Sequence, residues 1–496
     1  MNIKEAKEQV GYTVKSYLTK NAEGEYTVPL VRQRPIFLMG PPGIGKTAIM
    51  EQVADELEIA IVSYSMTHHT RQSALGLPFI IDKVYDGKTV RVTEYTMSEI
   101  ISSIYDAMEE TGRKEGILFL DEINCVSETL APSMLQFLQF KTFGRHKIPA
   151  GWVVVTAGNP PEYNDSVRDF DIVTWDRLKR IDIGPDFNAW KEYAYKKGIH
   201  ASIITYLNIR PQDFYLVQTT VDGKSFVTAR GWEDLSSIIC LYEENDFPVD
   251  INLVSQYIQN ARIAEDFSIY YILYRKYKSD YQIDKILEGD YDDAIVSRAG
   301  DAKFDERLTV LGLLLDNLGQ GFRKVYEQEE VLRILVGNIK SYQNDMCMGS
   351  ASSAMENVAL VQKKLDTEAG GTGDTAELYK LAGKRLAEMV RDIQDTETAD
   401  GAAVYAALKE LVAADNAARK ELAERCGSHL SNVFGFVEKA FDSNEMLILV
   451  TELTCSFHSS NYISHYGSNE YFAHNRDLQF YERQKEIDLE INKMDL

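Results

Sequence analysis

Short, continuous apolar runs recur in the first third of the chain. They cover residues 35–39, 117–120 and 152–157, and a polar segment follows each run. Apolar runs of this length are typical of strands buried on both faces, as in a parallel sheet covered by helices. Residues 59–65 predict a further strand, and residues 48–58 predict a helix between two of these strands. The pattern therefore predicts an α/β core.

Two β-hairpins are expected as inserts in this core. Residues 76–95 hold the dipeptide Asp86-Gly87 between two β-prone arms, and such a dipeptide favours a two-residue hairpin turn. A second hairpin is predicted at residues 138–151. Residues 98–111 predict a helix that leads into the strand at 117–120.

The remainder of the chain has mainly helical periodicity. Residues 1–20 place apolar side chains on one face, and residues 187–280 predict a bundle of helices. The small, polar segment at residues 367–375 predicts a flexible break. Residues 376–425 are rich in Ala, Lys, Glu and Leu, which favours long helices or a helical hairpin.

Composition narrows the class of protein. The chain has 496 residues, of which 45% are hydrophobic and 26% charged, as in ordinary globular proteins. Its net charge of −23 repels phosphate backbones and argues against a nucleic-acid partner. No membrane span or secretory signal is expected, and five cysteines without a C-x-x-C pair fit reduced thiols. We expect a cytoplasmic protein without a metal site made from protein ligands alone.

Residues 40–47 read GPPGIGKT and join the first strand to the helix that follows it. In this spacing, backbone N–H groups and the helix N-terminus surround the phosphates of a nucleotide. Lys46 would reach the β- and γ-phosphates, and the Thr47 hydroxyl would hold Mg²⁺. Gly43 and Gly45 allow the tight bends. The alternative is a chance glycine-rich turn. The expected nucleotide contacts are Pro42, Gly43, Ile44, Gly45, Lys46, Thr47 and Ala48.

Two adjacent carboxylates, Asp121 and Glu122, follow the apolar run at 117–120. Side chains alternate along a strand, so we expect the two carboxylates to have different tasks. Asp121 would hold the Mg²⁺ shell, and Glu122 would polarise a water for attack on the γ-phosphate. The alternative is a solvated strand end, which the phosphate loop upstream makes the weaker interpretation.

Asn159 follows the strand at 152–157. An amide at the tip of a buried strand can hold the attacking water or sense the γ-phosphate. An Asn before Pro160 can equally form a turn, and we favour the sensor role.

In this order and spacing, the three elements resemble the core of an AAA+ ATPase. Residues 174–180 look like the segment that carries the arginine finger, with Arg177 as the candidate and Arg180 and Arg168 in reserve. Residues 228–232 resemble the helix start called sensor 2, and Arg230 is its arginine. A guanidinium can neutralise the charge of the transferred phosphoryl group. A surface salt bridge for Arg177 and a helix-start surface position for Arg230 are the alternatives.

The two hairpins resemble the inserts of the MoxR branch of AAA+ proteins. Two departures weaken this assignment, because Ala229 stands where the branch has a proline and Leu178 where it has a phenylalanine. The resemblance covers residues 20–280. It implies an α/β core with a P-loop parallel sheet, two hairpin inserts and a helical lid. The region after residue 281 lies outside the resemblance, and its own pattern predicts a mostly α-helical C-terminal region. We expect four regions along the chain: an N-terminal helix and linker at 1–34, the nucleotide-binding core at 35–185, the helical lid at 186–280 and a helical region at 281–496. The last region is expected to bind a partner or to organise the oligomer.

The resemblance implies an ATPase that uses ATP and Mg²⁺, assembles into a ring of six identical subunits and remodels or matures a partner protein. MoxR-type ATPases often work with a protein that carries a von Willebrand factor A domain. An arginine finger has a function only beside a neighbour's nucleotide, which supports the homo-oligomer.

The hairpins would face a central pore in such a ring. Arg145, His146 and Lys147 lie at the tip of one hairpin, and Tyr85 and Lys88 at the tip of the other. Contact with substrate through them is one interpretation, and a plain connection is the other. Ser65 or Thr67 is a candidate to restrain Glu122, whereas His68 and His69 are expected to be loop residues.

Two other functions remain open at this level. One is a nucleotide-dependent DNA motor or a restriction-associated ATPase or GTPase, and the other is a scaffold that holds the nucleotide without hydrolysis. The acidic balance argues against the first, and Glu122, Asn159 and Arg177 argue against the second. The loop that selects adenine over guanine lies in the linker before Pro35, and this linker has no clear sequence pattern. The sequence therefore does not predict whether the protein prefers ATP or GTP.

Overall fold

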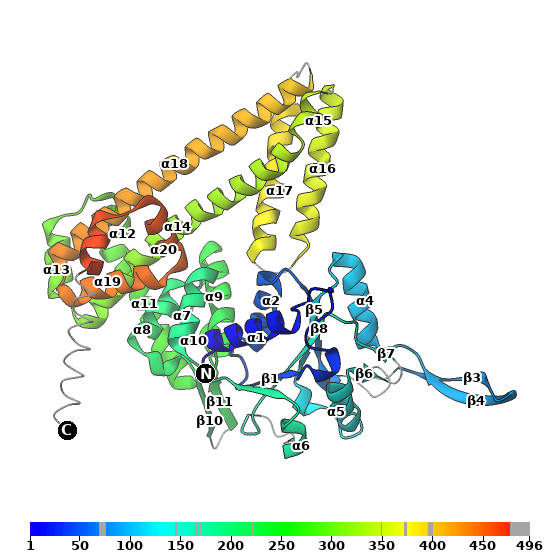
Figure 1. Cartoon of the computed structure of the whole chain (residues 1–496). Coiled ribbons are helices and arrows are strands. Elements are labelled where there is room, and N and C mark those ends of the chain that lie inside the picture. The colour runs from blue at the N-terminus through cyan, green and yellow to red at the C-terminus, as the bar shows by residue number, and fades with distance from the viewer. Residues whose placement is uncertain are drawn as a thin grey trace. The chain divides into compact units, whose positions relative to one another are not determined.

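A computed structural model describes residues 1–68, 76–143, 146–163, 167, 170–220, 223–348, 350–371, 374–394 and 400–476 (Figure 1). The chain forms two compact units. The first comprises residues 1–189 and 228–230, and the second comprises residues 190–227 and 231–496.

A five-stranded parallel sheet forms the centre of the first unit, with the strand order β2-β5-β8-β1-β9. The AAA+ α/β architecture expected from the sequence is therefore confirmed. Because β8 lies between β5 and β1, the carboxyl ends of these three strands are neighbours at one edge of the sheet. The strands are β1 (Ile36–Met39), β2 (Ala60–Ser65), β5 (Gly116–Asp121), β8 (Trp152–Gly158) and β9 (Lys179–Asp182).

Helices cover this sheet and share a core with it. In α4, the Ser98 side chain accepts a hydrogen bond from the N–H of Ile101 and begins the helix, and Gly112 in the left-handed conformation ends it. Ile100, Ile101 and Ile104 of α4 are buried in the same core as Leu118 of β5. The helices of this unit include α1 (Ile3–Tyr17), α2 (Lys46–Glu56), α4 (Glu99–Thr111), α5 (Ala131–Phe140) and α6 (Ile172–Trp175), with the 3₁₀ turns η1 (Leu30–Arg32), η2 (Met66–His68) and η3 (Ile123–Cys125).

The first predicted hairpin is confirmed. Strands β3 (Pro78–Tyr85) and β4 (Lys88–Tyr95) pair antiparallel around Asp86 and Gly87, whose φ angles are +48° and +76°. The second hairpin is smaller than the sequence predicted. Helix α5 continues to Phe140, so β6 (Thr142–Phe143) and β7 (His146–Lys147) form only a short ladder. Gly144 and Arg145 lie outside the described residues.

The segment predicted as an all-helical bundle contains a further hairpin, so that prediction was wrong in part. Strands β10 (Leu216–Thr220) and β11 (Gly223–Val227) pair antiparallel. The β-branched residues in these two short segments carry the signal that a helical interpretation overlooks. Helix α11 begins after Asn260, whose side chain accepts a hydrogen bond from the N–H of Ile263. The helices are α7 (Phe187–Lys197), α8 (Ala201–Ile209), η4 (Pro211–Asp213), α9 (Ala229–Glu244), α10 (Ile251–Tyr257) and α11 (Ala261–Asp280).

Two long helices dominate the C-terminal region, as Figure 1 shows. Helices α14 and α18 contain 38 and 40 residues, which corresponds to roughly 60 Å each. The helices are α12 (Ile283–Glu288), α13 (Asp293–Asp301), α14 (Phe304–Ser341), α15 (Gln343–Cys347), α16 (Ala351–Ala369), α17 (Asp374–Gln394), α18 (Gly401–Ala440), α19 (Ser443–Cys455) and α20 (Phe457–Tyr466).

Two hydrophobic cores hold these helices together. One joins α15, α16 and α17 to the C-terminal end of α14 and the N-terminal end of α18. It contains residues such as Leu335, Val361 and Leu386. The other joins α14, α18 and α19 to Ala201 of α8 and Tyr274 of α11. This second core contains residues on both sides of residue 281, where the sequence predicts the end of the lid. The division of the chain into domains at that residue remains a prediction. No described helix has the length and hydrophobicity that crossing a membrane requires.

Candidate nucleotide site

The loop at residues 40–47 connects β1 to α2 at the carboxyl edge of the sheet. Gly43 and Gly45 have φ angles of +71° and +94°, a region that side chains disfavour. A Cβ atom on Gly43 would also lie 2.9 Å from the Thr228 side chain. Glycine at position 43 is therefore required by the backbone conformation and by the close approach of Thr228.

Lys46, the first residue of α2, is 8% exposed. Its ammonium group donates hydrogen bonds of 2.7 Å and 2.8 Å to the carbonyls of Gly40 and Pro41, and of 2.8 Å to Oδ1 of Asn159. Burial lowers the pKa of Lys46 to about 8, against the attraction of the Asp121 carboxylate. A cation held by neutral oxygens at this position is suited to bind an incoming phosphate.

Thr47 and Asp121 meet at the same edge. The Thr47 hydroxyl lies 3.2 Å from Oδ2 of Asp121, while Oδ1 of Asp121 accepts a hydrogen bond of 2.8 Å from the N–H of Glu122. A hydroxyl and a carboxylate are oxygen ligands of the kind Mg²⁺ takes when substrate phosphates complete its shell. The donor set therefore fits the metal that the sequence predicts.

The sequence analysis expected Asp121 and Glu122 to point in different directions because side chains alternate along a strand. That reason was wrong, because the backbone conformation of Glu122 itself directs its side chain. Strand β5 ends at Asp121, and Glu122 has a φ angle of +55°. This conformation is uncommon for a residue with a side chain, and it turns Glu122 out of the strand. Its Oε2 accepts hydrogen bonds of 3.1 Å from Ser65 and of 3.1 Å from Thr67. Both candidates for a restraint thus contact Glu122.

Asn159 follows the end of β8, and its side chain contacts Lys46 as described above. Its own carbonyl accepts a hydrogen bond of 2.8 Å from Nδ2 of Asn124, which is 1% exposed. A Cβ on Gly158 would lie 2.4 Å from Oδ1 of Asn124, so the two segments pack tightly here. Sequence analysis missed Asn124, because an asparagine in a short turn carries no signal of its own.

The two candidate arginines have different surroundings. The backbone N–H of Arg230 donates a hydrogen bond of 3.2 Å to the carbonyl of Gly43. Burial is the main cause of the lowered pKa of Lys46, and the positive charge of Arg230 lowers it further. Arg177 is exposed and donates a hydrogen bond of 2.7 Å to the side chain of Gln139. Arg230 therefore belongs to the phosphate loop's own surroundings, and Arg177 lies on the surface.

The two alternative candidates for the arginine finger are Arg180 and Arg168. Arg180 stacks over the ring of Trp175 at 4.7 Å and forms a 2.8 Å ion pair with Asp182. Arg168 lies outside the described residues, as do His69 and the side chain of His68. At the hairpins, Tyr85 and Lys88 are exposed, and Nε2 of His146 lies 3.3 Å from the carbonyl of Tyr95. That contact joins the two hairpins.

Comparison with known proteins agrees with this geometry. The model of the family described as ATPase family associated with various cellular activities (AAA) matches residues 36–167. These residues are an AAA ATPase domain. The match contains β1, the phosphate loop, the carboxylates of β5 and Asn159, and the AAA ATPase domain implies hydrolysis of ATP, typically with Mg²⁺.

Other comparisons add little. A search of curated proteins found no match. Among solved structures, the chain is similar to a mutant of RuvB from Thermotoga maritima with 14% identity, over 57% of this chain and 75% of that chain. The TM-score of this match is 0.29.

Proposed function

We propose that the chain is a MoxR-type AAA+ ATPase that assembles into a ring of six subunits and remodels or matures a partner protein. Lys46 and the loop residues 42–48 bind the nucleotide, Thr47 and Asp121 hold Mg²⁺, and Glu122 acts as the general base. Asn159 and Arg230 sense the γ-phosphate within the subunit, and Arg177 acts on the neighbouring subunit's nucleotide.

The convergence at Lys46 is the observation that carries the proposal. Its ammonium group contacts the phosphate loop and Asn159, and the Asp121 and Glu122 carboxylates both act on its charge. Three separate strand ends therefore supply one site. A chance glycine-rich turn or a solvated strand end does not account for this convergence.

The residues of the chain perform the reaction by positioning and charge. Lys46 neutralises negative charge on the phosphate oxygens, because phosphoryl transfer spreads charge over them, and Mg²⁺ held by Thr47 and Asp121 would supply further positive charge there. The Glu122 carboxylate takes the proton of the attacking water, and the Asn159 amide orients the same reaction centre. While Ser65 and Thr67 hold Oε2 of Glu122, this carboxylate is less available as a base.

The role of Arg177 in a neighbouring subunit rests on its exposure and on the surface around it. Helix α6 ends at Trp175, close in sequence to Arg177, and exposes 86% of Ile172 and 57% of Val173. Apolar side chains this exposed are typical of a surface that another protein covers. A second subunit on this surface would bring its nucleotide toward Arg177.

The MoxR assignment and the client class rest on the two hairpins and on the resemblance of the motifs. The exposed hairpin β3–β4 and the short hairpin β6–β7 stand where that branch has inserts. We propose a partner that carries a von Willebrand factor A domain. Rotation of the lid during the ATP cycle would move the hairpins against the client.

A Glu122→Gln variant of the full chain tests the proposal. We expect ATP binding to persist and turnover to fall by about 10²-fold or more, because a general base contributes on that order. Affinity capture with this variant and ATP should retain the client. Unchanged turnover would reject Glu122 as the base. Tight, salt-sensitive DNA binding would favour the motor, and wild-type protein that binds ATP without hydrolysis would favour the scaffold.

A further inference from the structure

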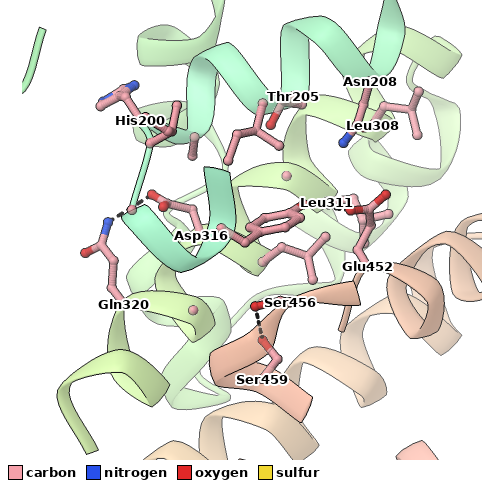
Figure 2. A pocket seen from close by; sticks show the side chains of 18 of the residues that line it. His200, Thr205, Asn208, Leu308, Leu311, Asp316, Gln320, Glu452, Ser456 and Ser459 are labelled. Atoms are coloured by element: carbon pink, nitrogen blue, oxygen red, sulfur yellow. Dashed lines mark hydrogen bonds between the residues drawn. The ribbon is translucent and has the colours of Figure 1, made fainter. Parts of the chain in front are cut away.

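The second unit contains a cavity of about 550 Å³ that has no part in the nucleotide site. It lies between α8, α14 and the corner where α19 meets α20 (Figure 2). Apolar side chains such as Ile204, Leu311 and Ile448 form much of its wall. Polar side chains form the rest of the wall, among them Asp316, Gln320 and Glu452, which Figure 2 labels.

One glycine in this wall is unexplained by packing. Glycine is less stable than alanine inside a helix, so a buried helix keeps glycine where a neighbouring side chain needs the room. A Cβ on Gly312 would lie 2.3 Å from the Thr205 hydroxyl, and a Cβ on Gly321 would lie 2.9 Å from the Cys426 sulfur. A Cβ on Gly319 would meet nothing within 4 Å, although Gly319 lines the cavity. The missing side chain at Gly319 leaves the cavity open.

Asp316 supplies an incompletely satisfied acceptor. Its Oδ2 accepts a hydrogen bond of 3.0 Å from Nε2 of Gln320, and the part of the chain that the structure describes records no donor for Oδ1. Burial raises the pKa of Asp316 above its ordinary value. A carboxyl group in this position gains from a donor, and gains more from a cation.

His458 supplies a second acceptor. The side chain is 6% exposed, and its Nε2 lies 3.4 Å from the carbonyl of Lys196. A carbonyl only accepts, so Nε2 carries the hydrogen and Nδ1 is left with a lone pair. Burial lowers the pKa of His458, which favours this neutral ring. Among the described residues, Nδ1 has no hydrogen-bond partner.

The other charges of the wall are largely compensated. Glu452 forms a 2.7 Å ion pair with Lys191, and Arg323 forms a 2.7 Å ion pair with Glu327. Asp305 is exposed to solvent. Asp316 is half-buried and has no ion pair within the described ranges. The cavity thus has an apolar body and a carboxylate, Asp316, for which the described residues form no ion pair, although the charges of His200 and Lys278 act on it.

We propose that this cavity binds a small organic cation, a protonated amine on an apolar body. The ammonium group of the ligand supplies the hydrogen bond that Oδ1 of Asp316 lacks. The apolar body lies against Ile204, Leu311 and Ile448, in the space that Gly319 leaves open. Binding would join α8 to α14 within the second unit and does not depend on the nucleotide site.

Three protonated amines of increasing size serve as probes, namely butylamine, phenethylamine and tryptamine. Each is compared with its neutral alcohol: butanol, phenylethanol and tryptophol. Binding to the full-length chain without nucleotide is measured by calorimetry and by the rise in Tm with ligand concentration, because a ligand of the native state stabilises it. We expect at least one amine to bind about tenfold or more tightly than its alcohol.

Two variants test the assigned residues. Gly319→Leu places a side chain in the cavity, and we expect it to abolish amine binding. Gly337→Leu is the matched control, because Gly337 is an exposed glycine of the same helix whose Cβ would also meet nothing within 4 Å. Asp316→Asn should reduce the affinity for the amine about tenfold or more and leave the affinity for the alcohol unchanged.

Each contrary result overturns the proposal. Absence of binding by every amine, or equal binding of amine and alcohol, would reject the cation. Retained binding in Gly319→Leu would reject the cavity. If Gly319→Leu lowers Tm relative to Gly337→Leu, the Asp316→Asn comparison decides, and unchanged amine affinity there rejects the site. None of these measurements requires ATP turnover, so failure here leaves the proposed ATPase function untouched.

Discussion

The Ser65 hydroxyl donates a hydrogen bond of 3.1 Å to Oε2 of Glu122. The register of the sheet makes this possible, because Ser65 at the end of β2 pairs with Asp121 at the end of β5. Thr67 donates to the same oxygen and lies 3.0 Å from the Ser65 hydroxyl. An oxygen that already accepts two hydrogen bonds has its lone pairs occupied and is less accessible to a water molecule. The hydroxyl groups of Ser65 and Thr67 therefore hold the proposed base in a restrained position.

Removing this restraint should raise basal turnover. In Ser65→Ala combined with Thr67→Val, we expect ATP hydrolysis without a partner to rise by up to about tenfold, equivalent to about 1.4 kcal/mol of barrier. Phosphate release measured at saturating ATP checks this. The same pair of changes combined with Glu122→Gln should remain inactive. Equal or slower turnover in the double variant would show that the two hydroxyl groups support catalysis instead.

Arg177 should act across a subunit boundary. Arg177→Ala and Lys46→Ala are each expected to lose hydrolysis, the first by about 10³-fold, because an arginine finger contributes on that order. Mixing the two proteins should restore part of the activity. An intact nucleotide site of the Arg177→Ala subunit then faces the intact Arg177 of its neighbour. A mixture no more active than the separate variants would place Arg177 outside the reaction.

The exposed apolar end of α6 should belong to the subunit interface. Ile172 is 86% exposed, so Ile172→Glu is expected to leave the monomer folded and weaken its assembly, because a buried unpaired charge is costly. Sedimentation or light scattering with ATP and Mg²⁺ measures the oligomer. Ile272→Glu on α11 is the control, since Ile272 is 62% exposed and belongs to a helix of the second unit. Equal assembly in both variants would contradict the assignment.

Nucleotide affinity should depend on the protonation of Lys46. Burial lowers its pKa to about 8, and the negative charge of a bound phosphate would raise it again. Below about pH 8 the amine is already charged, so ADP affinity should be level. Above about pH 8 binding must take up a proton, and the affinity should fall by up to about tenfold per pH unit.

Calorimetry at about pH 9 in two buffers of different ionisation enthalpy measures this proton uptake. Lys46→Arg is the control, because a guanidinium stays charged over the whole range and should show no uptake. Wild-type protein that binds ADP at this pH without taking up a proton would contradict the pKa assigned to Lys46.

The sequence predicted the elements that local patterns encode. Apolar runs before polar tips predicted β1, β5 and β8, and Asp86-Gly87 predicted the first hairpin at its observed turn. The sequence also predicted roles for Lys46, Thr47 and Asp121 from spacing alone, because a phosphate loop and a carboxylate strand are each made of residues adjacent in the chain. The β10–β11 hairpin was missed because two short strands within helical surroundings give a weak signal.

Only the tertiary structure decided how distant residues meet. The hydrogen bonds of Ser65 and Thr67 to Glu122 depend on strand order and on the left-handed backbone of Glu122. Asn124 beneath Asn159 and the open space at Gly319 follow from packing between segments far apart in the chain. Local sequence determines which residue types are present and which elements they form. Long-range packing determines which of their polar atoms remain without partners, and those atoms define the sites.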